Sequence, residues 1–211
     1  MSAPTTERRR RLDREAVVAA AERLLDEHGY DELTMTSLAA ELGTRVSSLY
    51  NHVDSLEDLR SALQIRAMSE LGRAVRTAAM GQTGAAGIRA LCQAYRDFAK
   101  AHPARYAAMT RPPIDPANYF AASVDAAEAV GVIVRTSGVA AEHVLPLQLA
   151  IFATIHGYVS LDTSGFFVGI DDLEPIFAQT LRAVTSMAVM QATEPIPLTS
   201  TPSVLTDRAS V

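Results

Sequence analysis

One short segment gathers the side chains whose types and spacing fit the recognition of double-stranded DNA. It runs Thr36-Ser-Leu-Ala-Ala-Glu-Leu-Gly-Thr-Arg-Val-Ser-Ser-Leu-Tyr-Asn-His-Val53. On a helix over about 45–53, a rotation of about 100° per residue places Val46, Leu49 and Val53 on one side. The opposite side carries small polar residues flanked by larger ones, namely Ser47, Ser48 and Asn51 beside Tyr50 and His52. Such a face can enter a major groove.

The chemistry of this face divides into base recognition and phosphate contact. Small polar groups let the helix backbone approach base edges, whereas longer donors at the flanks reach phosphates. Arg45, at the expected helix start, can reach a guanine edge or a phosphate, and Thr36 can contact a phosphate from the start of the preceding helix. The candidate DNA-binding residues are therefore Thr36, Arg45, Ser47, Ser48, Tyr50, Asn51 and His52.

The elements that must hold this face are two short helices joined by a tight turn. Ala39 is small enough for the helices to cross closely, and Gly43 supplies the glycine that the turn needs. Three leucines, Leu38, Leu42 and Leu49, can share one small core. Any amphipathic helix pair with a polar outer face would also fit, but the spacing favours a helix-turn-helix.

Further helices are predicted on both sides of this pair. An apolar stripe over about 12–25 predicts a first helix that Gly29 ends, and another helix is expected over about 56–80. The expected caps are Thr34 or Thr36 for the second helix and Asp54 or Ser55 for the helix from 56.

The second half of the chain also has helical periodicity. The expected helices cover about 85–101, stopped by Pro103, then about 115–136, about 144–163, and a last one to about 191 capped by Asp171 or Asp172. Pro146 must lie near the start of its helix or kink it, because proline has no N–H to donate. No segment predicts a strand.

Composition and charge limit the location and the partners. The chain has 211 residues and a formal net charge of −5, which argues against an unspecific basic nucleic-acid coat, although Arg8–Arg11 and Arg14 concentrate positive charge near the start. The single cysteine, Cys92, allows no internal disulfide. We find no signal peptide and no apolar run of the roughly 18 residues that span a bilayer. These features predict a cytoplasmic protein with no membrane partner.

Three segments near the start together resemble the TetR/AcrR family of regulators. They read Leu33-Thr-Met-Thr-Ser-Leu-Ala-Ala-Glu-Leu-Gly43, Val46-Ser-Ser-Leu-Tyr-Asn-His-Val53 and Ser55-Leu-Glu-Asp-Leu59, within a similarity over about 12–72. The resemblance implies a dimeric all-helical protein, usually a repressor released by a small ligand. It also implies that Tyr50 and His52 hold the DNA backbone while Arg45, Ser47 and Ser48 lie in the groove.

Two positions depart from the pattern of that family. Thr44 occupies a turn position that is usually apolar, and Leu56 stands where a phosphate-binding lysine is common. These departures predict weaker DNA binding or a changed salt dependence.

The C-terminal half carries the candidate residues of a ligand cavity. Most aromatic and Met side chains there are expected in the core, and some could line a cavity between helices. The candidate pocket residues are Tyr95, Phe98, Tyr106, Met109, Tyr119, Phe152 and His156. A histidine on an apolar helix is more often a core residue with its hydrogen bonds satisfied than a ligand contact. His156 is therefore either a hydrogen-bonded core residue or a contact to the effector.

Two segments of this half, 95–106 and Ile155-His-Gly-Tyr-Val159, resemble the C-terminal domain that some family members carry, named for a Trp-His-Gly motif. Ile155 replaces the Trp, while His156 and Gly157 match. In that family the last two helices of each subunit form a four-helix dimer interface. The expected apolar face consists of Ile176, Leu181, Val184, Met187 and Val189.

These patterns predict an all-α fold with an N-terminal three-helix helix-turn-helix DNA-binding domain and a C-terminal helical ligand-binding and dimerisation domain. The expected ranges are a disordered basic arm over 1–10, the DNA-binding domain over 11–72, the second domain over 84–191 and a disordered tail over 192–211.

The predicted function is a DNA-binding transcriptional regulator, expected to be a repressor, that a small and mostly apolar ligand releases from a near-palindromic operator. The alternative is a helical ligand-binding protein or enzyme that uses the C-terminal cavity beside a degenerate DNA head. The sequence holds no paired carboxylates on one face, no Cys/His dyad, no Gly-rich phosphate loop and no metal-ligand spacing. We therefore expect no enzyme activity, no cofactor and no metal.

Overall fold

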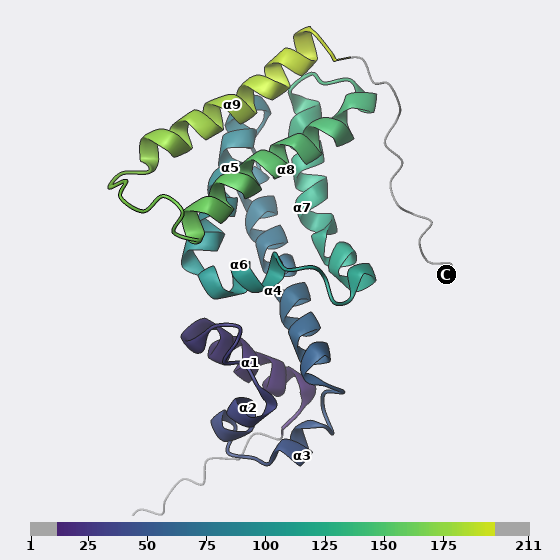
Figure 1. The fold of residues 1–211 in the computed structure, drawn as a ribbon. Coiled ribbons are helices and arrows are strands. Elements are labelled where there is room, and N and C mark those ends of the chain that lie inside the picture. Colours follow the sequence, from purple (N-terminus) through teal and green to yellow (C-terminus); the bar gives the residue numbers. More distant parts are fainter. Residues whose placement is uncertain (1–11, 197–211) are drawn as a thin grey trace, which may run out of the picture.

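The computed structural model describes residues 12–196, and all regular structure in that range is helical, as predicted. The helices are α1 (Arg14–His28), α2 (Met35–Glu41), α3 (Val46–Leu49), α4 (Leu56–Ala79), α5 (Gly84–Ala101), α6 (Pro103–Met109), α7 (Pro116–Thr136), α8 (Ala141–Thr163) and α9 (Glu174–Thr193). Figure 1 shows α1–α3 at one end of α4 and the later helices around its other end. We call residues 12–63 the head and residues 64–196 the body.

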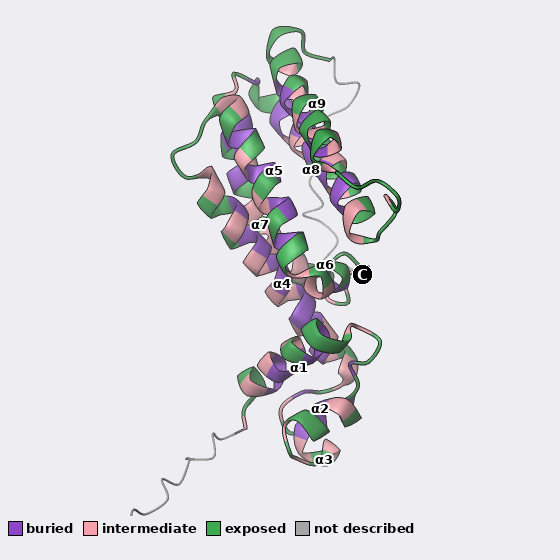
Figure 2. Ribbon diagram, turned by 90° about the vertical axis from the view of Figure 1, so that its left-hand side faces the viewer, coloured by how far each residue is buried: buried purple, intermediate pink, exposed green. Residues whose placement is uncertain are grey.

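Each unit has its own hydrophobic core, and α4 contributes to both. Leu59 and Leu63 of α4 lie in the head core, whereas Met68, Leu71 and Val75 lie in the body core. Figure 2 shows the buried residues along the inward faces of both units. Because α4 has 24 residues and a helix rises about 1.5 Å per residue, it spans about 36 Å. The head and the body are therefore joined by one continuous helix.

Local signals account for the helix boundaries of the head. Gly29 ends α1 with a φ of 83°, as predicted. Thr34, rather than Thr36, caps α2, because its hydroxyl accepts from Ser37 N while the Ser37 hydroxyl accepts from Thr34 N. Ser55 caps α4 by accepting from Asp58 N at 2.9 Å. These caps satisfy backbone donors that a helix start leaves free.

The body differs from the prediction at two prolines and at the start of its last helix. Pro103 ends α5, but it also begins α6, which the sequence did not predict; its fixed φ suits the first position of a helix. Helix α8 begins at Ala141, so Pro146 lies in its second turn rather than at its start. The N-cap of α9 is Leu173 rather than Asp171 or Asp172, although Asp172, one residue before it, accepts from Glu174 N at 2.9 Å.

Helices α7 and α8 are long and apolar enough, by length and composition, to cross a membrane. The prediction that no stretch of the chain reaches this length is therefore wrong. Helix α7 packs against α4 so closely that a Cβ added at Gly72 would lie 3.4 Å from the Cβ of Asp125. Residues of both helices, including Ile133 and Val134 of α7 and Ile151 and Ile155 of α8, lie in the body core, so part of their apolar surface is used for packing within the body.

The terminal segments predicted from the sequence lie largely outside the residues that the structure describes. The basic arm over 1–10 and the tail from 197 lie outside residues 12–196, while α9 continues to Thr193, two residues beyond the expected end. Arg14, which the sequence grouped with the arm, is the first residue of α1.

Candidate nucleic-acid interface and cavity

Helices α2 and α3 form the predicted helix-turn-helix. Gly43 has a φ of 58°, a conformation that favours glycine, and Thr44 N donates to Ala39 O at 2.9 Å to close the turn. Leu38 and Leu49 are fully buried beneath it. The turn and the small core below it fix the angle between the two helices.

The second helix is shorter than predicted. Only Val46–Leu49 is helical, with Arg45 as N-cap and residues 50–52 in a turn. His52 N donates to Leu49 O at 2.8 Å, a bond over three residues that tightens the chain before α4 begins. The expectation of a helix through Val53 is wrong for this reason.

The division into a core side and an outer side is confirmed. Leu49 and Val53 are buried and Val46 is half-buried. Among the candidate DNA-binding residues, Thr36, Arg45, Ser47, Tyr50 and Asn51 are exposed, while Ser48 and His52 are half-buried. The Tyr50 side chain is one of the large apolar groups left open to solvent, at 53% exposure. An aromatic ring in this position is available to a partner.

Asp58 holds the turn that carries Tyr50 and His52. Its two carboxylate oxygens each accept a bond of 2.7 Å from the Arg14 guanidinium, and Arg14 also donates to His52 O at 3.2 Å. Asp54 N donates to the same carboxylate at 3.0 Å. The hydrogen bonds from Arg14 hold the pKa of Asp58 below its ordinary value. This pair, which the sequence did not predict, connects α1, α4 and the candidate interface.

We expect Asp58→Asn to lower the free energy of unfolding by about 0.5–1 kcal/mol at pH 7, a typical value for a partly exposed ion pair. Because the folded pKa of Asp58 lies below its unfolded value, the stabilisation is present above about pH 4 and is lost as pH falls through the folded pKa. Urea unfolding at pH 7 and pH 3 measures both effects. Asp125→Asn, which removes an exposed pair with Arg76 in the body, is the matched control. An equal loss at both pH values would contradict the role of Asp58.

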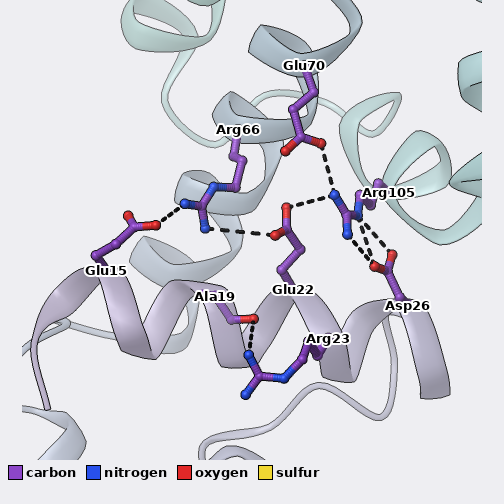
Figure 3. A network of polar contacts seen from close by, with 8 residues as sticks. All are labelled: Glu15, Ala19, Glu22, Arg23, Asp26, Arg66, Glu70 and Arg105. Atoms are coloured by element: carbon purple, nitrogen blue, oxygen red, sulfur yellow. Dashed lines mark hydrogen bonds and ion pairs between the residues drawn. The ribbon is translucent and has the colours of Figure 1, made fainter. Parts of the chain in front are cut away.

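A second ion-pair network joins the body to the head, as Figure 3 shows. Arg105 of α6 donates from Nε to Asp26 at 3.0 Å and from Nη1 to Glu70 at 3.0 Å, and Nη1 lies 3.2 Å from Glu22. Burial raises the pKa of Glu22, and Arg105 opposes that rise. We call Arg105 and these three carboxylates the Arg105 clasp. It attaches α6 of the body to α1 of the head.

The body contains two adjoining cavities. The first chamber has a volume of about 390 Å³ between α4, α5, α7 and α8, and its lining is almost entirely apolar. The second chamber, of about 350 Å³, borders the loop between α6 and α7. The two share five lining residues, Met68, Tyr95, Tyr119, Phe120 and Phe152. Their volumes lie in the range of small-molecule sites.

A polar cluster lies where the chambers meet. The hydroxyls of Tyr95 and Tyr106 both lie 3.0 Å from His156 Nδ1. Phe152 stacks on the imidazole with ring centroids 5.5 Å apart. Burial lowers the pKa of His156 and raises that of Tyr106. The imidazole is therefore neutral at pH 7.

The structure brings together five of the seven candidate pocket residues. Tyr95, Met109, Tyr119, Phe152 and His156 border one or both chambers. Two do not: Phe98 packs against His102 in the core, and Tyr106 lies behind His156. Sequence reasoning missed Met68, Phe120, Gln148 and Arg111, which come from α4, α7, α8 and a loop.

The sequence matches two family profiles that follow one another along the chain. Residues 17–63 match the family described as bacterial regulatory proteins, tetR family. Residues 88–184 match the tetracyclin repressor-like C-terminal domain. The first match covers the helix-turn-helix and the second covers most of the body.

Relatives and solved structures agree with these matches. The chain is 36% identical over 179 residues to an uncharacterized HTH-type transcriptional regulator, Rv0681 of Mycobacterium tuberculosis, covering 84% of this chain and 82% of the relative. Its fold is similar to that of BioQ, solved with its double-stranded DNA operator (TM-score 0.60, 24% identity, 84% of this chain and 98% of that one). It is also similar to TetR of Acinetobacter baumannii, solved with minocycline (TM-score 0.63, 18% identity, 88% and 99%). The chain belongs to the TetR family of helix-turn-helix transcriptional regulators.

Proposed function

We propose that this regulator binds a near-palindromic DNA operator as a homodimer and represses transcription until a small, mostly apolar molecule enters the body. One observation carries the proposal: an exposed helix-turn-helix face is joined by α4 and the Arg105 clasp to a body that contains two cavities. A ligand that favours one arrangement of two heads changes operator affinity, with typical couplings of about 1–3 kcal/mol. BioQ bound to its operator and TetR bound to minocycline support both halves of the proposal.

The homodimer would use α8 and α9. Five residues were expected to form its apolar face, but Val184 is fully buried within the subunit, and Ile176, Leu181 and Met187 pack against the body core. The exposed surface instead carries small and apolar residues, namely Leu149, Ala150, Phe152, Ala153, Gly157 and Leu161 on α8 with Ala183, Val189 and Met190 on α9. Small residues allow two helices to approach closely, and a second copy would cover this face.

Gly157→Arg tests this face. A Cβ added at Gly157 would meet no atom within 4 Å of it, so the subunit itself tolerates a side chain there. We expect Gly157→Arg to convert the dimer to monomer at micromolar concentration, whereas Gly157→Ala should keep the dimer and stabilise α8 by up to about 1 kcal/mol. Light scattering gives the mass and thermal unfolding the stability. A dimeric Gly157→Arg variant would place the interface elsewhere.

The proposal also includes the type of the C-terminal domain, the location of the protein and the absence of enzyme activity. The Trp-His-Gly type of C-terminal domain is supported by His156, whose imidazole joins Tyr95 of α5 to Tyr106 of α6. We further propose a cytoplasmic protein without enzyme activity or a membrane partner. The apolar lengths of α7 and α8 then serve the body core and the dimer.

Selection of binding sites from random DNA tests the proposal as a whole. We expect a near-palindromic site whose half-sites lie about 34–36 Å apart, one DNA turn. Tyr50→Phe should weaken binding to selected and random DNA by a similar factor, about 2–10-fold, because a phosphate contact carries no base information. No enrichment from the library, by a dimer that is correctly folded, would contradict the DNA-binding function.

A further inference from the structure

The two chambers differ in the chemistry of their walls. No residue that borders the first chamber carries a formal charge. The second chamber is bordered by Thr110, Arg111 and His156. Among the described residues that line the chambers, Arg111 alone is charged at pH 7, because burial lowers the pKa of His156. The cavity thus has an apolar end and an end with a net positive charge.

His156 presents a hydrogen-bond donor at the polar end. The Tyr95 and Tyr106 hydroxyls both lie 3.0 Å from His156 Nδ1, and they also hydrogen-bond each other. We assign Nδ1 as an acceptor, because one buried hydroxyl can then donate to the ring while the other donates to the first hydroxyl. The proton of the neutral imidazole then lies on Nε2. Nε2 is not among the buried atoms of the described residues that lack a partner, and it therefore retains accessible surface. Because His156 borders the second chamber, we assign this N–H to an acceptor bound there.

Arg111 connects the same chamber to the head. Its guanidinium lies 4.0 Å from the centroid of the Tyr30 ring and 4.0 Å from Asp31. The loop that carries Arg111 is fastened to α4 by Gln64, which is only 1% exposed; its amide donates to Pro112 O at 3.3 Å and accepts from Ile114 N at 3.1 Å. The loop is thus held to α4, while the Arg111 side chain is half exposed.

We infer that the effector is an amphipathic monocarboxylate, with its apolar body in the first chamber and its carboxylate in the second, where His156 Nε2 and the Arg111 guanidinium donate to it. A carboxylate matches two N–H donors and the positive charge of Arg111. The inference rests on the proposed function, since it names the chemical class of the effector. A carboxylate bound in this way competes with Tyr30 and Asp31 of the head for the Arg111 guanidinium. Ligand binding would thereby change a contact between body and head and so lower the affinity for the operator.

Two matched ligand pairs test the inference, with an alkyl and a ring body: decanoate against decan-1-ol, and 2-naphthylacetate against 2-naphthaleneethanol. Calorimetry on the full-length dimer should show at least one carboxylate binding at least tenfold more tightly than its alcohol. Arg111→Gln should remove that preference and leave alcohol binding unchanged. Arg89→Gln is the matched control, because Arg89 is exposed on α5 and borders neither chamber. Operator affinity should fall with the carboxylate and not with the alcohol.

The possible outcomes distinguish failure of the effector class from failure of the DNA-binding function. Equal binding of acid and alcohol, binding of neither, or an unchanged acid preference in Arg111→Gln would overturn the monocarboxylate inference. Operator binding measured without any ligand tests the proposed function by itself. A dimer that binds its operator but no carboxylate therefore refutes only the effector class.

Discussion

Arg105→Ala should lower the free energy of unfolding by about 2 kcal/mol at pH 7. The substitution leaves Glu22, Asp26 and Glu70 close together without the cation that they share. Removing one partner of a fully buried ion pair costs about 3–5 kcal/mol. The Arg105 side chain is 18% exposed, so solvent reduces the cost at this site. Urea unfolding of the dimer measures the change.

The pH dependence of this loss identifies its cause. Burial already raises the pKa of Glu22, and without Arg105 it would rise further. A carboxyl group with a raised folded pKa stabilises the protein below its unfolded pKa and loses that contribution as pH rises. The deficit of Arg105→Ala should therefore shrink between pH 7 and about pH 4.5. Arg73→Ala, on an exposed position of α4, should show neither effect. A deficit that is constant with pH would indicate lost packing instead.

The head could be predicted well because its determinants are local. Gly29, the Thr34 cap and Gly43 act within a few residues of themselves, and all three have the roles that the sequence indicated or allowed. The short length of α3 could not be predicted, because it depends on how Asp58 of α4 and Arg14 of α1 hold the following turn. That pair joins residues 44 positions apart.

The body could be predicted only in outline. Its helices follow from periodicity, but the chambers depend on which helix faces which. Tyr106 and Arg105 are neighbours on α6, a helix that the sequence did not predict, and they point to different partners: His156 in the body and the carboxylates of α1 in the head. No pattern along the chain indicates that Gln64 fastens the loop at 112–114. Contacts of this kind require the folded chain.

Arg45→Ala should weaken operator binding by about 1–3 kcal/mol, or about 5–150-fold in Kd, if Arg45 donates to a guanine. Arg45 is exposed at the N-cap of α3, and its side chain makes no hydrogen bond or ion pair with another described residue. Glu41 is the only other charged residue between Thr34 and Val53, and Arg23 pairs with it at 3.4 Å. No second cation of this segment can therefore replace Arg45 in the groove.

The base preference distinguishes the two possible partners of Arg45. A bidentate contact to guanine specifies one base pair, so sites selected by Arg45→Ala should lose the preference at a single position of each half-site. A phosphate contact would weaken binding to all sequences and leave the selected site unchanged. Arg23→Ala is the control, since it removes the same charge from the head but not from the groove-facing segment. If Arg45→Ala and the wild type select the same sequence, Arg45 contacts the backbone, and recognition depends on Ser47, Ser48 and Asn51.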